Sequence, residues 1–300
     1  MGSEGGVTKF GLLLCQTPPV PSKKGVAEAK TDALEAAKKL VGEGIAAHPG
    51  AKMVVLPEMF ACPYGTKFFE PFCEPVPDAQ AAEPNTDQSP SVKVLVDIAK
   101  SHGVWLVGGS VSERDSAGKI YNTCLVFNPQ GHIVAKHRKV HLFDIDIPGK
   151  MTFKESETLS AGGQVTTFES PFGTIGVGIC YDVRFAELAL SMRQRGAQVL
   201  IYPGAFNTTT GPAHWRILCQ GRALDTQCYV AVCSPARSED AGDYPAWGHS
   251  LVVDPWGEVK VELDEKPGFA FVDVDLDYLK DVRTRVPISM QKRPELYELK

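Results

Sequence analysis

The sequence has 300 residues, of which 43% are apolar and 22% are charged, and its formal net charge is −5 at pH 7. This length can bury a large core as one domain or two, and the slightly acidic balance gives no electrostatic reason to expect a nucleic-acid partner. The first residues lack the basic region and apolar run of a secretory signal, and no apolar run is long enough to cross a bilayer. We expect a cytoplasmic protein without membrane contact, with an organelle left open, whose partner is a small molecule.

Short β-rich runs alternate with longer helical patterns along the whole chain, which is typical of a layered α/β fold. In chain order, the patterns predict strand Lys9–Cys15, helix Ala27–Ala47, strand Met53–Leu56, helix Val92–Ala99, strand Val104–Gly108, strand Thr174–Ile179, helix Phe185–Arg195, strand Val199–Tyr202, helix Trp215–Thr226 and strand Tyr229–Cys233. Turns rich in Pro and Gly predict two further antiparallel hairpins, over Asn122–Lys136 and His249–Val261.

These elements suggest two related halves, each contributing a mixed sheet. The best surface loop is Asp78–Ser89, and no linker divides the chain. We therefore expect residues 1–6 to form a flexible leader and residues 7–300 to form a single domain with a C-terminal tail.

The eight cysteines are dispersed and lie mostly in apolar stretches, so we expect reduced thiols instead of a disulfide framework. No Cys-x-x-Cys pair occurs. His137 and His141 have helical ligand spacing, but no Glu or Cys between or beside them completes a metal site. The sequence predicts neither a metal nor another cofactor.

Three segments share a layout in which an apolar strand runs into a reactive side chain: Met53 to Glu58, His132 to Lys139, and Thr174 to Cys180. The carboxyl ends of strands are where α/β proteins collect ligands and catalytic groups. The three segments are far apart in the sequence, so only folding could bring them together.

Each of the three side chains has an ordinary structural interpretation as well. Cys180 follows a Gly-rich strand and precedes a helix expected to begin near Arg184, whose positive end would favour a thiolate, but position alone favours a buried structural cysteine. Glu58 could be a general base or a surface charge at a strand end. Lys139 could stabilise an oxyanion, although the basic run Lys136–Lys139 resembles a solvated face.

Other reactive motifs are absent from the sequence. The glycines at 173, 176 and 178 have neither the dinucleotide-binding spacing nor that of a P-loop. No Gly-x-Ser-x-Gly elbow of a serine hydrolase occurs. None of the seven histidines lies in a recognisable base motif, which argues against a cysteine protease.

Taken in order, four motifs resemble those of the nitrilase superfamily of carbon–nitrogen hydrolases, and specifically its omega-amidase branch. They are Leu56-Pro-Glu58, Lys136-His-Arg-Lys139-Val-His-Leu, Gly178-Ile-Cys180-Tyr-Asp-Val-Arg184-Phe and Tyr202-Pro-Gly-Ala-Phe-Asn207. The resemblance implies a four-layer αββα sandwich with two mixed sheets. It also implies a catalytic triad of Glu58 as base, Lys139 as oxyanion stabiliser and Cys180 as nucleophile.

The same resemblance assigns further site residues. Glu155 matches a second glutamate near the triad, and Arg184 and Thr210 match residues that hold a substrate carboxylate. Tyr64 matches a tyrosine at the mouth of the pocket. Three aromatic residues either line the pocket or belong to the plain core, an alternative that the sequence leaves open: Phe143, Phe206 and Trp247.

The expected reaction is hydrolysis of the terminal amide of a small 2-oxo acid amide, such as 2-oxoglutaramate or 2-oxosuccinamate, through a cysteine thioester. A rival within the superfamily is an amidase for deaminated glutathione, and a rival of another class is a catalytically idle binding scaffold. Tyr181 and Asp182 after the nucleophile favour an amide over a nitrile. The resemblance implies a homodimer or larger homo-oligomer, to which the tail Val286–Leu299 could contribute.

Overall fold

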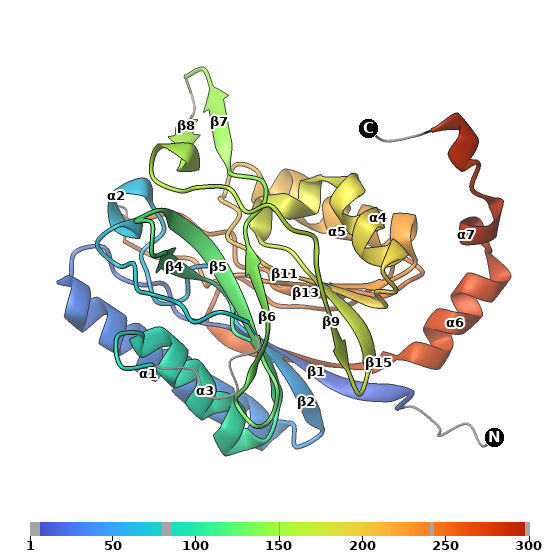
Figure 1. The fold of residues 1–300 in the computed structure, drawn as a ribbon, viewed down its shortest axis with the longest axis horizontal. Coiled ribbons are helices and arrows are strands. Elements are labelled where there is room, and N and C mark those ends of the chain that lie inside the picture. The colour runs from blue at the N-terminus through green and yellow to red at the C-terminus, as the bar shows by residue number, and fades with distance from the viewer. Residues whose placement is uncertain (1–6, 80–85, 150, 241–242, 298–300) are drawn as a thin grey trace.

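The computed structural model describes the chain except residues 1–6, 80–85, 150, 241–242 and 298–300. The predicted leader and the middle of the predicted loop Asp78–Ser89 lie outside the described residues. Two β-sheets pack face to face, and α-helices cover the outer face of each sheet (Figure 1). The expected four-layer αββα sandwich with two mixed sheets is confirmed.

The first sheet contains seven strands, most of them from the first half of the chain. In spatial order they are β15 (Gly268–Asp275), β1 (Lys9–Gln16), β2 (Ala51–Val55), β3 (Trp105–Val107), β5 (Ile120–Phe127) and β4 (Val111–Arg114), with β6 (Ile133–Arg138) also pairing with β5. Strands β1, β2 and β3 are parallel to one another, whereas β15 is antiparallel to β1. The sheet is therefore mixed.

The second sheet has six strands and is also mixed. Its order is β14 (Val259–Glu262), β13 (Leu251–Val253), β12 (Tyr229–Cys233), β11 (Val199–Pro203), β10 (Gly173–Val177) and β9 (Thr166–Ser170). The central strands β10, β11 and β12 are parallel, and the outer pairs are antiparallel. A separate hairpin of β7 (Asp144–Ile147) and β8 (Met151–Lys154) projects from the body at the top of Figure 1.

Strand β1 shows why the central strands are apolar on both faces. Leu12 and Leu14 belong to the core that fills the space between the two sheets, whereas Leu13 and Cys15 face the helices of the first layer. Since side chains alternate along a strand, a sheet buried on both sides needs a nearly continuous apolar run. This is the pattern from which Lys9–Cys15 was predicted.

The helices complete the outer layers. α1 (Val26–Ala47) and α3 (Pro90–His102) bury one apolar face each against the first sheet, and α4 (Ala186–Gln194) and α5 (Gly211–Thr226) do so against the second. The short helix α2 (Thr66–Phe69) lies in the loop after β2. Beyond β15, α6 (Leu276–Arg285) and α7 (Ile288–Gln291) extend along the edge of the molecule (Figure 1).

The ten predicted strands and helices and the two predicted hairpins all occur, with ends that differ by a few residues. Helix α5 begins at Gly211 instead of Trp215, because Pro212 fits the first turn of a helix, where its missing N–H would be unpaired in any case. Each half contributes most strands of one mixed sheet, as expected, but the halves are not separate. Strand β15 leaves the second half and pairs along all of β1, so the two halves share the first sheet.

The backbone around Gly109 holds the end of strand β2 in place. Gly109 has a positive φ of 63°, and a Cβ atom added there would lie 2.2 Å from the carbonyl oxygen of Pro57. The next residue, Ser110, accepts a hydrogen bond from the Met59 amide on its hydroxyl and donates its own amide to Pro57. The segment that carries Glu58 therefore depends on a residue without a side chain at position 109.

We predict that Gly109→Ala lowers the free energy of unfolding by about 3 kcal/mol, since left-handed strain and overpacking both act there. The matched control is Gly118→Ala, which has a φ of 82° but no atom within 4 Å of the added Cβ. It should cost only about 1 kcal/mol, the strain alone. Urea unfolding of both variants checks this, and equal losses would contradict the role given to the Pro57 contact.

Candidate active site

The three predicted side chains meet at one end of the sandwich, although they come from two sheets. Glu58 follows β2 and Lys139 follows β6 in the first sheet, and Cys180 follows β10 in the second. Because β3 is parallel to β2, and β6 is related to β3 through two antiparallel pairings, β2 and β6 run in the same direction. Their carboxyl ends therefore lie at the same rim. Cys180 reaches the same place from the second sheet, so the site forms between the two sheets.

Lys139 is the centre of a buried ionic cluster. Its Nζ atom lies 2.9 Å from Oε1 of Glu58 and 2.9 Å from Glu155, and the side chains of all three residues are fully buried. Glu155 also accepts hydrogen bonds from the Tyr64 hydroxyl and the Phe143 amide, both at 2.7 Å. Two carboxylates thus share one ammonium in a fully buried cluster.

The cluster changes the proton affinities of its members. Burial raises the pKa of Glu58, with a further rise from the charge of Glu155, against the lowering by Lys139. Burial alone would lower the pKa of Lys139, but the two carboxylates outweigh it and hold the pKa well above its usual value. Lys139 is therefore a permanent cation, and Glu58 is the member that can exchange a proton.

Glu58 keeps one oxygen available. Oε1 accepts hydrogen bonds from Lys139 and from the Asn122 side chain at 2.8 Å. Oε2 is buried, and none of the described residues hydrogen-bonds to it. The Cys180 thiol is close enough for each group to alter the pKa of the other. The geometry lets Glu58 receive a proton from the thiol without giving up its contact with Lys139.

Cys180 lies at a strained turn. Its φ is 47°, a left-handed conformation that side chains other than glycine rarely adopt. The Ala205 amide, just beyond β11, donates a hydrogen bond to its sulfur at 3.4 Å. The turn that begins at Cys180 is a 3₁₀ helix, Cys180–Arg184, and α4 starts only at Ala186.

The expectation that the positive end of a helix favours a resting thiolate is therefore wrong. Burial raises the pKa of the Cys180 thiol well above its usual value, and the neighbouring Glu58 raises it further, against Lys139 and the Ala205 amide. The sulfur rests as a thiol. A thiol needs a base before it can act as a nucleophile, and Glu58 is the carboxylate beside it.

A small pocket opens beside Cys180. Its empty space is about 190 Å³, and it is lined by the following residues: Phe143, Cys180, Tyr181, Arg184, Ala205, Phe206, Thr210 and Tyr244. Arg184 is half-buried there, with its guanidinium 4.8 Å from the Phe206 ring centre. It makes no salt bridge with any described carboxylate, and its Nε atom is buried without a hydrogen-bond partner among the described residues.

The other predicted pocket residues divide into two groups. Phe143 and Phe206 line the pocket, as does Thr210, whose hydroxyl donates a hydrogen bond to Asn207 at 3.1 Å. Trp247 is not among the lining residues. It packs instead against Gly211 at the start of α5, where an added Cβ would lie 2.3 Å from the indole, so its assignment to the pocket wall is corrected.

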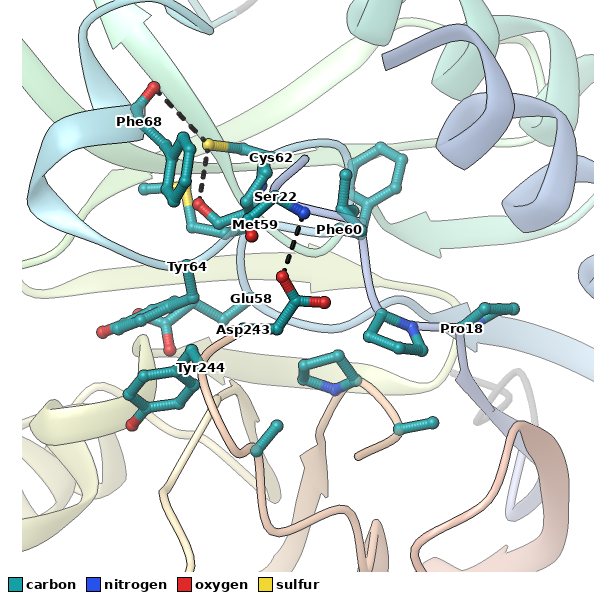
Figure 2. A pocket seen from close by; sticks show the side chains of 16 residues that line it. Pro18, Ser22, Glu58, Met59, Phe60, Cys62, Tyr64, Phe68, Asp243 and Tyr244 are labelled. Carbon is teal, nitrogen blue, oxygen red and sulfur yellow. Dashed lines mark hydrogen bonds between the residues drawn. The ribbon is translucent and has the colours of Figure 1, made fainter. Parts of the chain in front are cut away.

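Tyr64 lies on a neighbouring hollow that Figure 2 shows, with Glu58, Tyr64 and Tyr244 along one side of it. The rings of Tyr64 and Tyr244 are 4.5 Å apart, and Tyr244 also lines the pocket that contains Cys180. Tyr244 donates its hydroxyl to the Ala205 carbonyl at 2.8 Å. The two tyrosines therefore separate the hollow of Figure 2 from the Cys180 pocket.

Sequence reasoning missed Asn122, Ala205 and Tyr244. Asn122 is a polar residue inside an apolar strand, which is a signal that could have drawn attention to it. Ala205 acts through its backbone amide, and Tyr244 lies in a polar loop, so neither has a distinguishing pattern. Only the folded chain shows that they contact the cluster.

All eight cysteines are free, as expected. No helix in the described part of the chain is long and apolar enough to span a membrane. The described residues also contain no group of three or more His, Cys, Asp or Glu side chains that could hold a metal ion.

Comparison with known proteins places the chain among relatives of similar length. The family model for carbon-nitrogen hydrolase matches residues 14–284. A protein of Danio rerio named omega-amidase NIT2 is 52% identical over 293 residues, which cover 98% of both chains. The Homo sapiens protein of the same name is 47% identical over 291 residues, covering 97% of this chain and 98% of that protein.

The crystal structure of Saccharomyces cerevisiae Nit3, described as a member of branch 10 of the nitrilase superfamily, has 39% sequence identity and a TM-score of 0.85. The match covers 98% of this chain and all of that one. The two mixed sheets, the three converging strand ends and these relatives agree. The chain belongs to the carbon–nitrogen hydrolase family of the nitrilase superfamily, and it is a hydrolase that acts on carbon–nitrogen bonds.

Proposed function

We propose that the chain is an omega-amidase that hydrolyses the terminal amide of small 2-oxo acid amides, such as 2-oxoglutaramate and 2-oxosuccinamate, to a dicarboxylate and ammonia. The single observation that carries the proposal is the buried Glu58–Lys139–Glu155 cluster beside Cys180, with the uncompensated Arg184 in the same pocket. The names of the relatives at about half identity support the same activity.

In the first half of the reaction, the Cys180 thiol gives its proton to Glu58 while the sulfur forms a bond with the amide carbon. The carbonyl oxygen becomes an oxyanion beside the Lys139 ammonium, which is already in place and needs no reorganisation. Glu58 then passes the proton to the amide nitrogen. The carbon–nitrogen bond breaks, ammonia leaves, and a thioester remains on Cys180.

In the second half, a water molecule attacks the thioester carbon and gives a proton to Glu58. Lys139 stabilises the second oxyanion, the carbon–sulfur bond breaks, and the sulfur takes the proton back from Glu58. The raised pKa of Glu58 suits both directions of transfer, because a carboxyl group of ordinary pKa is a weak base towards a buried thiol. Glu155 takes no part in bond making in this scheme and holds Lys139 in position.

The substrate carboxylate is proposed to bind Arg184. A half-buried guanidinium without an anionic partner is costly, and a planar carboxylate can meet it with two hydrogen bonds. Thr210 lines the same pocket, and its hydroxyl can turn from Asn207 towards the ligand. Phe143 and Phe206 line the same pocket as Cys180 and Arg184 and would contact the acyl chain.

The names of the relatives favour this substrate class over deaminated glutathione. Measuring amine release from 2-oxo acid amides and from deaminated glutathione tests the choice directly. Faster turnover of deaminated glutathione would assign the chain to that rival. A catalytically idle scaffold would release no amine from either substrate.

Three further proposals concern the domain organisation, the oligomeric state and the cellular location of the chain. We propose that residues 7–300 form one domain, which the shared pairing of β1 and β15 supports. We also propose a homodimer, which sedimentation velocity tests. Exposed apolar side chains on α5 and in the tail support it: Ile217, Leu224, Met290 and Leu296. A cytoplasmic location is supported by the eight free cysteines, and cell fractionation tests it.

We predict that Cys180→Ala abolishes ammonia release from 2-oxoglutaramate while the fold is retained, because no other group can form the thioester. The matched control is Cys73→Ala, which removes a partly buried thiol from a loop outside the pocket. It should keep normal turnover. The measurement is ammonia release at saturating substrate, and residual turnover by Cys180→Ala would remove the nucleophile assignment.

We predict that Arg184→Ala raises the Michaelis constant for a carboxylated amide by about 10- to 100-fold, corresponding to the loss of a charge-assisted hydrogen bond of about 1.5–3 kcal/mol. A neutral amide of the same chain length should lose little. Arg195→Ala, which removes a surface guanidinium bonded to the Val165 carbonyl, is the control. Equal losses on both amides would contradict the carboxylate role.

We predict that Glu155→Gln moves the acid limb of the kcat/KM profile to lower pH. Glu58 must be deprotonated to act as a base, so activity falls as the pH drops through its raised pKa, and the charge of Glu155 is one cause of that rise. Removing the charge lowers the pKa of Glu58. A profile that stays in place, or moves to higher pH, would show that Glu155 does not set the proton affinity of Glu58.

A further inference from the structure

Asp182 joins the two segments that carry Lys139 and Cys180. It is fully buried, two residues beyond Cys180 in the 3₁₀ turn. His137 lies two residues before Lys139 and His141 two residues after it, and both histidines contact Asp182. Asp182 Oδ1 is 2.7 Å from Nδ1 of His141, and Oδ2 is 3.1 Å from Nε2 of His137.

The remaining acceptor positions of Asp182 are occupied by backbone amides. Oδ1 accepts from the His141 amide at 2.9 Å, and Oδ2 accepts from the Ile179 amide at 2.9 Å. The Asp182 amide in turn donates to the Ile179 carbonyl at 3.0 Å. Ile179 and Asp182 therefore close a ring around Cys180, which holds its left-handed backbone conformation.

The histidines are themselves fixed in orientation. Nδ1 of His137 lies 2.9 Å from the Thr166 hydroxyl, which can donate to it and leave the proton on Nε2, facing Asp182. The ring of His141 stacks on Phe185 with centres 3.6 Å apart. Burial would raise the pKa of Asp182, but the hydrogen bonds from both histidines and from Ile179 outweigh it and keep the pKa well below its usual value. Asp182 is a permanent carboxylate.

We infer that Asp182 is a positioning residue, which fixes the Cys180 sulfur relative to the Lys139 ammonium by holding His137, His141 and the Ile179 amide with one carboxylate. The inference rests on the proposed roles of Lys139 and Cys180. These two groups come from different sheets, and Asp182 bonds the turn of the second sheet to the loop of the first. Neither sheet alone determines the distance between nucleophile and oxyanion stabiliser.

The first test is Asp182→Asn. The asparagine side chain has the same shape as aspartate, but its NH₂ group replaces one carboxylate oxygen and so faces two of the donors that bonded to that oxygen. We expect kcat to fall about 100-fold, the loss typical of a reacting group displaced by about 1 Å, with the Michaelis constant little changed because Arg184 still binds the carboxylate. Asp254→Asn is the matched control. Asp254 is also buried and accepts two backbone amides, but it lies in the β13–β14 turn, so kcat should stay normal.

The second test uses variant pairs at the half-buried His141. Asn can replace the Nδ1 donor of histidine, whereas Ala cannot, so His141→Asn should keep most of kcat and His141→Ala should lose it. The loss in the double variant Asp182→Asn, His141→Ala should be smaller than the sum of the two single losses, since both changes disturb the contact between Asp182 and His141. His137→Gln and His137→Leu form the corresponding pair for the Nε2 donor.

The outcomes separate the inference from its alternatives. Normal kcat in a folded Asp182→Asn variant, or equal kcat for His141→Asn and His141→Ala, would overturn it. If Asp182→Asn does not fold, the His141 pair decides, because that side chain is only half-buried. Activity in Cys180→Ala would instead refute the proposed function itself. A purely structural role would lower thermal stability in both members of each pair without separating their kcat values.

Discussion

The site depends on one unequal balance of charge, in which a single buried ammonium faces two buried carboxylates. Lys139 cannot leave Glu58 or Glu155 without leaving a buried charge unpaired, so the three side chains hold one another in place. The same inequality leaves one carboxylate incompletely compensated. Burial raises the pKa of Glu58, the charge of Glu155 raises it further, and one of its oxygens has no hydrogen-bond partner among the described residues; a base for a buried thiol needs these properties.

The fold serves this cluster by bringing two sheets together at their carboxyl rims. Strands β2 and β6 lead to Glu58 and Lys139, the proposed base and cation, and β10 leads to Cys180, the proposed nucleophile. A reaction centre that spans two sheets needs a connection between them, because packing of apolar side chains tolerates small shifts that catalysis does not. The Asp182 carboxylate is one such connection, and the pairing of β15 with β1, which ties the second half of the chain to the first sheet, is another.

Cys180 combines a strained backbone with a thiol of high proton affinity. A resting thiolate would be reactive towards any electrophile, whereas a buried thiol becomes nucleophilic only when it can pass its proton to Glu58. In the proposed function, the small pocket and the guanidinium of Arg184 select a carboxylated amide. The selectivity proposed for this site thus rests on the absence of an anionic partner beside Arg184 among the described residues as much as on the apolar walls of the pocket.

The sequence by itself determined the layered α/β class, the main strands and helices, and the strand-end placement of Glu58, Lys139 and Cys180, because alternation of apolar residues and turn chemistry are local signals. It did not determine that β15 crosses into the first sheet, since an edge pairing of residues over 250 positions apart has no local pattern. Nor did it reveal Asn122, Ala205 or Tyr244, or the central contacts of Asp182. Hydrogen bonds between segments distant in the chain, and the burial that shifts the pKa values of Glu58 and Cys180, exist only once the two sheets have packed together, so only the tertiary structure decided them.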